Sequence, residues 1–139
     1  MRWLFAIIAL LFVSACSGSG SSNYSAVMSA VDNSGGGKVF VLRDTGFSGS
    51  GALMNVTLNG SGIGRIGNGE TTVGTASNGT NYIEVSFGGF AGMGINSAPA
   101  SFQGSNDKNS YFIAKLTAGA LQNRLQLFEV SEAAFKGSF

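Results

Sequence analysis

Residues 52–67, with the sequence ALMNVTLNGSGIGRIG, decide the fold of this chain. Two apolar runs flank the dipeptide Asn59-Gly60 in this stretch. Asparagine and glycine tolerate the positive φ angles of a tight hairpin turn, so this dipeptide between two such runs is a strong hairpin signal. The stretch therefore predicts two antiparallel β-strands joined by a two-residue turn.

Strand and helix patterns precede this hairpin. The stretch KVFVLRD, which starts at Lys38, alternates with period two and places Val39, Val41 and Arg43 on one face. This pattern predicts a strand in the middle of a sheet. Further upstream, residues 24–31 (YSAVMSAV) carry apolar residues at helical spacing and end in DNSGGG, which indicates a short helix or an extended lead-in.

Further strands follow the hairpin at short intervals. Turn signals occur at residues 67–69 and 77–79, and Pro99 marks residues 100–103 as a short edge strand, because proline is tolerated only at a sheet edge. Ser131 is a good N-cap before the helix formers of SEAAF. Strands are expected at 70–76, 81–87, 110–116 and 123–130. The sequence therefore predicts an all-β, mostly antiparallel small sandwich of about seven strands, with a short C-terminal helical turn.

The phenylalanines are expected to build most of the core. Two of them, Phe90 and Phe102, lie in the glycine-rich stretch 88–109 and are candidates for an exposed contact surface. The expected core set is nevertheless Phe87, Phe90, Phe102, Phe112, Phe128 and Phe135.

Residues 1–15 have the anatomy of a signal peptide. Arg2 precedes an unbroken apolar run of eleven residues, and small residues follow it. A membrane-spanning helix needs about 20 apolar residues, so this run is interpreted as a targeting segment rather than a permanent span.

The residues Val13-Ser14-Ala15-Cys16 resemble the lipobox of bacterial lipoproteins, in which an aliphatic residue and two small residues precede a cysteine. The resemblance implies cleavage between Ala15 and Cys16 and acylation of Cys16, whose thiolate is nucleophilic enough to accept a lipid. Two or three acyl chains hold a protein stably at a bilayer. We therefore expect a lipid-anchored cell-envelope protein, and Ser17 implies the outer membrane, facing the periplasm.

Residues 16–37 are expected to be the lipidated cysteine and a flexible tether. The segment begins CSGSGSS, which is the composition of flexible linkers, and would hold a domain clear of the lipid head groups. The β-sandwich domain is then expected at residues 38–139, which is enough chain for one hydrophobic core.

Five segments, in order, resemble a family of bacterial lipoprotein domains of unknown function. The hairpin segment alone is also similar to the small PEGA modules. The family resemblance implies a compact, mostly antiparallel β-sandwich without known activity. The segments are VFVLR (39–43), FSGSG (47–51), VTLNGSGIGRIGNGE (56–70), YFIAKL (111–116) and LQLFEVSEAAF (125–135).

Charge and composition exclude several classes of function. Without Arg2 the chain has seven basic and seven acidic residues, so it lacks the clustered Lys and Arg that nucleic-acid binding needs. It contains no histidine, which excludes His-based triads and His-containing metal sites. Gly62, Gly64 and Gly67 match a dinucleotide fingerprint, but no helix can open after them, so they are interpreted as turn glycines. We expect no nucleic acid, no cofactor and no metal.

Arg43 is the charged residue with a predicted structural role. Its neighbours on the same strand face are apolar, so its guanidinium is expected to be partly buried and to need a carboxylate or several carbonyls. We expect a structural ion pair with Asp44, Glu84 or Glu129 in preference to ligand binding.

The sequence favours a structural or interaction role, with an unknown envelope protein as partner and no catalytic residues. Two alternatives remain open. Phe139 at the C-terminal end suggests a small outer-membrane β-barrel. The other alternative is a histidine-free envelope hydrolase, which would need Asp44, Glu70 and Glu84 close together.

Overall fold

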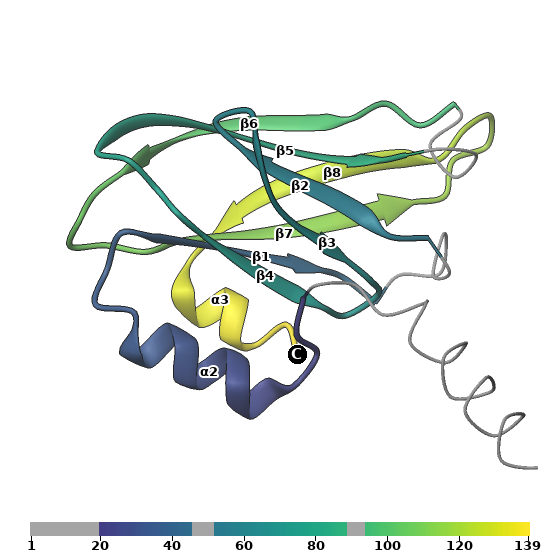
Figure 1. Cartoon of the computed structure of the whole chain (residues 1–139). Helices are drawn as coiled ribbons and strands as arrows, with labels where there is room; N and C mark the ends of the chain where they lie inside the picture. The colour runs from purple at the N-terminus through teal and green to yellow at the C-terminus, as the bar shows by residue number, and fades with distance from the viewer. Residues whose placement is uncertain (1–19, 46–51, 89–93) are drawn as a thin grey trace, which may run out of the picture.

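The computed structural model describes residues 20–45, 52–88 and 94–139 (Figure 1). Within these ranges the chain forms two helices and eight strands. In chain order they are α2 (Tyr24–Asn33), β1 (Lys38–Arg43), β2 (Met54–Leu58), β3 (Ser61–Ile66), β4 (Thr71–Thr75), β5 (Gly79–Phe87), β6 (Ala98–Gly104), β7 (Ser110–Thr117), β8 (Arg124–Val130) and α3 (Glu132–Lys136).

The strands form two four-stranded sheets that pack face to face (Figure 1). The first sheet has the order β4-β1-β7-β8 and the second has the order β3-β2-β5-β6. β1 and β7 are parallel, and the other strand pairs are antiparallel. The predicted small, mostly antiparallel β-sandwich is confirmed, as is its short C-terminal helix.

The hairpin predicted at Asn59-Gly60 joins β2 to β3. Both turn residues have positive φ, 50° for Asn59 and 82° for Gly60, as a tight two-residue turn requires. The Asn59 side chain also donates from Nδ2 to Oδ1 of the buried Asn81 on β5, at 2.9 Å. The hydrogen bond to Asn81 therefore holds the turn against β5, in addition to the φ preferences of Asn59 and Gly60.

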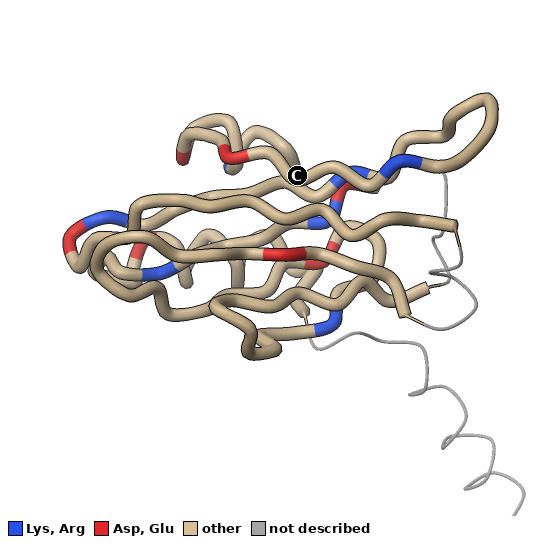
Figure 2. Tube along the Cα trace, turned by 90° about the horizontal axis from the view of Figure 1, so that it is seen from above, with Lys and Arg blue, Asp and Glu red and all other residues tan. Residues whose placement is uncertain are grey.

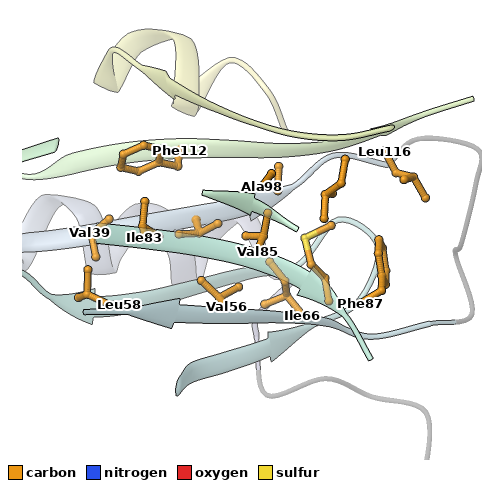
Figure 3. Close-up of a cluster of buried hydrophobic side chains, with 14 of the residues drawn as sticks. Val39, Val56, Leu58, Ile66, Ile83, Val85, Phe87, Ala98, Phe112 and Leu116 are labelled. Atoms are coloured by element: carbon orange, nitrogen blue, oxygen red, sulfur yellow. The ribbon is translucent and has the colours of Figure 1, made fainter. Parts of the chain in front are cut away.

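The main hydrophobic core lies between the two sheets (Figure 3). Val39 and Val41 of β1 enter it from the first sheet, and Phe102 of β6 meets Phe112 of β7 edge to face, with ring centroids 5.2 Å apart. Each such fully buried side chain contributes roughly 1.5–3 kcal/mol. Phe102 is therefore a core residue, as expected, and the alternative of an exposed surface is excluded for it because the strand alternation of β6 turns it inward.

A second, smaller core lies on the outer face of the first sheet, under α2 and α3 (Figure 1). Val27 and Val31 of α2 and Phe135 of α3 pack against Phe40 and Tyr111. The Phe135 ring centroid lies 6.1 Å from that of Phe40 and 5.1 Å from that of Tyr111. β1 is consequently covered on both faces, as its two apolar faces predicted.

The folded domain begins earlier than the predicted boundary at Lys38. Ser21 pairs with Thr71 at the edge of β4 through two backbone hydrogen bonds of 2.9 and 2.8 Å. α2 follows, capped by Asn23, whose side chain accepts from the Ala26 N–H at 3.1 Å. The part of the expected tether after residue 20 is thus ordered, because the apolar stripe of α2 finds a partner on the sheet. Residues 16–19 lie outside the described ranges.

Candidate functional site

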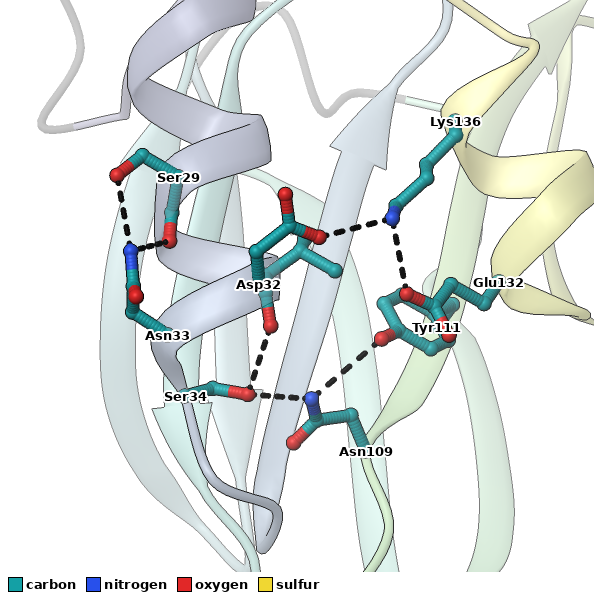
Figure 4. Close-up of polar contacts among 9 residues, drawn as sticks. Ser29, Asp32, Asn33, Ser34, Asn109, Tyr111, Glu132 and Lys136 are labelled. Atoms are coloured by element: carbon teal, nitrogen blue, oxygen red, sulfur yellow. Dashed lines mark hydrogen bonds and ion pairs between the residues drawn. The ribbon is translucent and has the colours of Figure 1, made fainter.

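A polar groove lies where α2 ends and α3 begins (Figure 4). Its volume is about 520 Å³. Four segments line it: the last turn of α2, the glycine turn after it, the turn between β6 and β7, and the start of α3. We define the polar groove by the side chains of Asp32, Ser34, Lys108, Asn109, Tyr111 and Glu132.

Consecutive glycines shape one wall of the polar groove. The backbone φ angles of Gly35, Gly36 and Gly37 are 72°, 102° and 73°, in a region that residues other than glycine rarely adopt. A Cβ on Gly36 would lie 2.5 Å from the carbonyl oxygen of Asn106. The glycine turn therefore packs its backbone directly against the turn between β6 and β7, and the sequence DNSGGG encodes this close approach.

Lys136 links the two helices beside the groove (Figure 4). Its Nζ lies 3.0 Å from Oδ1 of Asp32 on α2 and 3.0 Å from Oε1 of Glu132 on α3. The hydrogen bond to Asp32, followed by that to Glu132, raises the pKa of Lys136 above its ordinary value. The groups are exposed to solvent, so we attribute only a small stabilisation to these pairs. Their main effect is to offset part of the negative charge at the groove.

Asn109 is the polar hub of the groove. Its Nδ2 donates to Ser34 Oγ and, at 3.4 Å, to the hydroxyl of Tyr111, while its Oδ1 accepts from the Lys38 N–H at 3.1 Å. Ser34 Oγ in turn donates to the Val31 carbonyl at 3.0 Å. This network joins the end of α2, the start of β1 and β7, so the groove walls are held by several elements.

The chemistry of the groove suits hydrogen bonding better than catalysis. Burial raises the pKa of Tyr111, so its hydroxyl stays protonated at neutral pH. Lys136 offsets one of the two charges of Asp32 and Glu132, and Lys108 and Asp107, which also line the groove, offset each other. Within the described ranges no three acidic, His or Cys side chains are grouped as metal ligands would be. The groove thus offers donors and acceptors for a polar group or a peptide backbone.

Arg43, at the end of β1, is the largest buried charged side chain of the described residues and is 2% exposed. Its Nη1 donates to the carbonyl oxygens of Ala52 and, at 3.3 Å, of Ile66. The guanidinium carbon lies 5.0 Å from the ring centroid of Phe87, which places the charge over an aromatic face. Burial lowers the pKa of Arg43, while the charge of Glu70 acts in the opposite direction. Of the two partner types expected for a buried arginine, the structure provides backbone carbonyls.

The carboxylates predicted as ion-pair partners of Arg43 lie elsewhere. Asp44 forms an ion pair with Lys115 at 3.5 Å. Glu84 is exposed on β5 in the other sheet, where it accepts from Ser97 Oγ at 3.0 Å. Glu129 is exposed on β8, the edge strand of the first sheet. The expected pairing is corrected because Asp44 is paired with Lys115, Glu84 faces outward from the second sheet and Glu129 lies two strands away from β1.

The carboxylates considered for a hydrolase are not gathered into one site. Glu70 caps the turn before β4, where its Oε2 accepts from the Gly67 N–H at 2.7 Å. Asp44 is paired with Lys115, and Glu84 faces outward from the second sheet. Charged residues of both signs are instead spread along the trace (Figure 2).

The predicted lipidation and cleavage positions, Cys16 and Ala15, lie outside the described residues. In the ranges that the structure covers, no helix combines the length and the apolar character needed to cross a membrane.

The polar groove was not predicted from the sequence. Its residues come from segments that are far apart in the chain, so no local motif contains them. The run of three glycines after a helical pattern does signal a special turn, but only the fold shows that Asn109 and the turn between β6 and β7 lie against it.

Comparisons with known proteins do not assign a family. No family model matches the chain, and no curated protein matches it. Among solved structures, the chain is similar to the NMR structure of a protein from Eubacterium rectale, with 16% sequence identity and a TM-score of 0.42. That match covers 70% of this chain and 90% of the other. A similarity of this size carries no argument about function.

Proposed function

We propose that this chain is a lipid-anchored protein of the bacterial cell envelope, with a structural or interaction role rather than a catalytic one. Acylation of Cys16, after cleavage behind Ala15, supplies the anchor. The residue after the cysteine, Ser17, favours the outer membrane, with the domain facing the periplasm.

The observation that carries this proposal is the short distance in sequence between Cys16 and the edge of the folded domain. Gly20 lies against Ile66 and Thr71, and Ser21 pairs with β4. Four residues of chain from Cys16 to Gly20 reach at most about 14 Å. Acyl chains on Cys16 would therefore hold an already folded sandwich directly at a bilayer surface.

The polar groove supports an interaction role. It lies at the C-terminal end of α2, whereas Ser21 and the anchor lie at the N-terminal end. α2 has ten residues and is therefore about 15 Å long. The groove is thus about one helix length away from the start of α2, where a protein of the envelope can reach its donors and acceptors.

Replacing Cys16 by Ser tests the anchor. A serine hydroxyl does not accept the lipid, so the Cys16→Ser precursor should stay unmodified and should lose the mass of the acyl chains. The measurement is the intact mass of the purified protein, together with its distribution between membrane and soluble fractions. The unsubstituted protein is the control.

Two results would contradict the proposed function. One is an underivatised thiol on the purified native chain. The other is a Cys16→Ser protein that still fractionates with membranes after its signal segment has been removed.

A further inference from the structure

The helices leave part of the outer face of the first sheet uncovered. Three large aromatic residues are exposed there or beside it: Tyr24 is 54%, Phe128 45% and Phe139 42% exposed. Phe128 was expected in the core, but it points away from it, on the outer face of the edge strand β8. We call this surface the aromatic face and define it by Tyr24, Ile113, Phe128 and Phe139.

Strand register makes the floor of the aromatic face continuous. Leu42 of β1 pairs with Ile113 of β7, and Ile113 pairs with Phe128 of β8, so the three side chains form one row across the sheet. Two hollows of about 370 and 410 Å³ lie over this region. They adjoin each other, because Leu42, Asp44 and Ser138 line both.

The aromatic face lies beside the start of the folded chain. Ser22, Tyr24 and Phe139 line the same hollow, and the rings of Tyr24 and Phe139 meet edge to face with centroids 5.7 Å apart. Ser22 and Tyr24 of the aromatic face and its hollow therefore follow Ser21 closely in sequence, and Ser21 is the residue that pairs with Thr71 of β4.

We propose that the aromatic face rests on the lipid bilayer, with Tyr24, Phe128 and Phe139 at the level of the head groups. This inference rests on the proposed lipid anchor at Cys16. The reach of about 14 Å from Cys16 to Gly20 keeps the attachment edge of the domain close to the head groups, whose layer is about 5–7 Å thick in each leaflet. The surface next to the attachment point is then the one nearest to them.

The chemistry of the aromatic face fits a membrane interface. Tyrosine is enriched at the level of the head groups, and phenylalanine is typical of apolar surfaces that settle about 5–10 Å into the boundary with the acyl chains. The charges beside the floor, Lys115 and Asp44, form a pair and carry no net charge together. The first two turns of the neighbouring α2 expose only Tyr24, serines and alanines, so charge does not oppose the approach of this edge to lipid.

The opposite side of the sandwich provides a matched control. Tyr82 is 65% exposed on the outer face of the second sheet. The second sheet packs about 10 Å from the first, so Tyr82 lies on the side of the sandwich opposite the aromatic face. Leu121 is fully exposed in the loop between β7 and β8, at one end of the sandwich rather than on a sheet face. Each of these positions reports a different orientation of the anchored domain.

Tryptophan fluorescence can measure the orientation, because the only tryptophan of the chain is Trp3, in the segment proposed to be removed. The variants Phe128→Trp, Tyr82→Trp and Leu121→Trp would each give the mature protein a single reporter. Each lipidated protein is inserted into phosphatidylcholine and phosphatidylglycerol vesicles, with or without brominated acyl chains. We expect brominated lipid to reduce the emission of the Phe128→Trp protein by about half, because the quencher lies at the depth reached by an interfacial side chain. The other two proteins should be unchanged.

Flotation of the same vesicles separates the two proposals. A protein that floats but whose Phe128→Trp emission is not quenched by brominated lipid would overturn the orientation while leaving the anchor intact. Quenching of the Leu121→Trp or Tyr82→Trp protein instead would overturn the proposed orientation, because it would show that another surface of the domain faces the lipid. Protection of the Phe128→Trp protein from iodide without quenching by lipid would show that protein, such as a second copy, covers this face. A protein that does not float would contradict the anchor and the orientation together.

Discussion

Replacing Thr71 by Val should stabilise the domain, whereas the same replacement at its neighbour Thr72 should destabilise it. Both threonines are in β4 and are almost equally buried, 6% and 7% exposed. Thr71 Oγ1 is buried and has no hydrogen-bond partner in the described part of the chain. Thr72 Oγ1 donates to the Ile63 carbonyl at 2.8 Å. The two sites lie on opposite faces of β4, are buried to the same extent, and differ in whether the hydroxyl is satisfied.

The expected magnitudes follow from this difference. A buried polar group without a partner costs about 1–3 kcal/mol, so Thr71→Val should raise the free energy of unfolding by about 1 kcal/mol. Its new methyl group would enter a small apolar slot of about 100 Å³ that Val27 and Phe40 also line. Thr72→Val loses a hydrogen bond and leaves the Ile63 carbonyl without this donor, which should cost about 1 kcal/mol.

Thermal unfolding followed by circular dichroism measures both effects. A change of about 1 kcal/mol corresponds to a shift in Tm of roughly 4 °C in a domain of this size. The two variants should therefore differ by about 8 °C, in opposite directions from the unsubstituted protein. Shifts of the same sign, or a lower Tm for Thr71→Val, would refute the reasoning from hydrogen-bond satisfaction.

Two further predictions concern the polar groove. Gly36→Ala should destabilise the domain by about 3 kcal/mol, because φ is 102° and the new Cβ would meet the Asn106 carbonyl oxygen, whereas Gly35→Ala, with open space around it, should cost only about 1 kcal/mol. The urea concentrations at the midpoints of unfolding compare the two variants, and equal losses of stability would contradict the close approach at Gly36. A photo-reactive residue at Lys108, on the groove, should cross-link to another envelope protein in intact cells more strongly than one at Tyr82, and equal yields at the two positions would argue against the groove as the contact site.

Most of the sandwich could be predicted because its signals are local. Asn59-Gly60 needs only its own φ preferences to mark a hairpin, and the alternation around Val39 and Val41 is visible within six residues. Pro99 likewise marks β6 as an edge strand, since the missing N–H excludes a central position. In each case a few adjacent residues contain the whole physical reason.

The packing of the two predicted helices on the sheet and the partners of Arg43 could not be predicted in the same way. Val27 and Val31 appear in a short, mostly small-residue segment, and their burial depends on Phe135, which lies about a hundred residues later. Arg43 bonds to the Ala52 and Ile66 carbonyls, and sequence patterns carry no information on which backbone carbonyls a fold brings together. Phe128 is exposed because the helices cover the outer face of β8 at Val130 and leave Phe128 uncovered.

The early start of the fold changes which partners an anchored protein could reach. A flexible tether over residues 16–37 would extend to about 75 Å and let the domain search a large part of the periplasm. Because Ser21 is bonded to Thr71, the free length falls to about 14 Å, and α2 adds about 15 Å up to the polar groove. With the four residues from Gly20 to the start of α2, the groove stays within about 45 Å of Cys16, whichever way the domain leans. A partner that meets it must itself lie close to the same membrane, so the proposed interaction is one between neighbours at a bilayer surface rather than a link across the envelope.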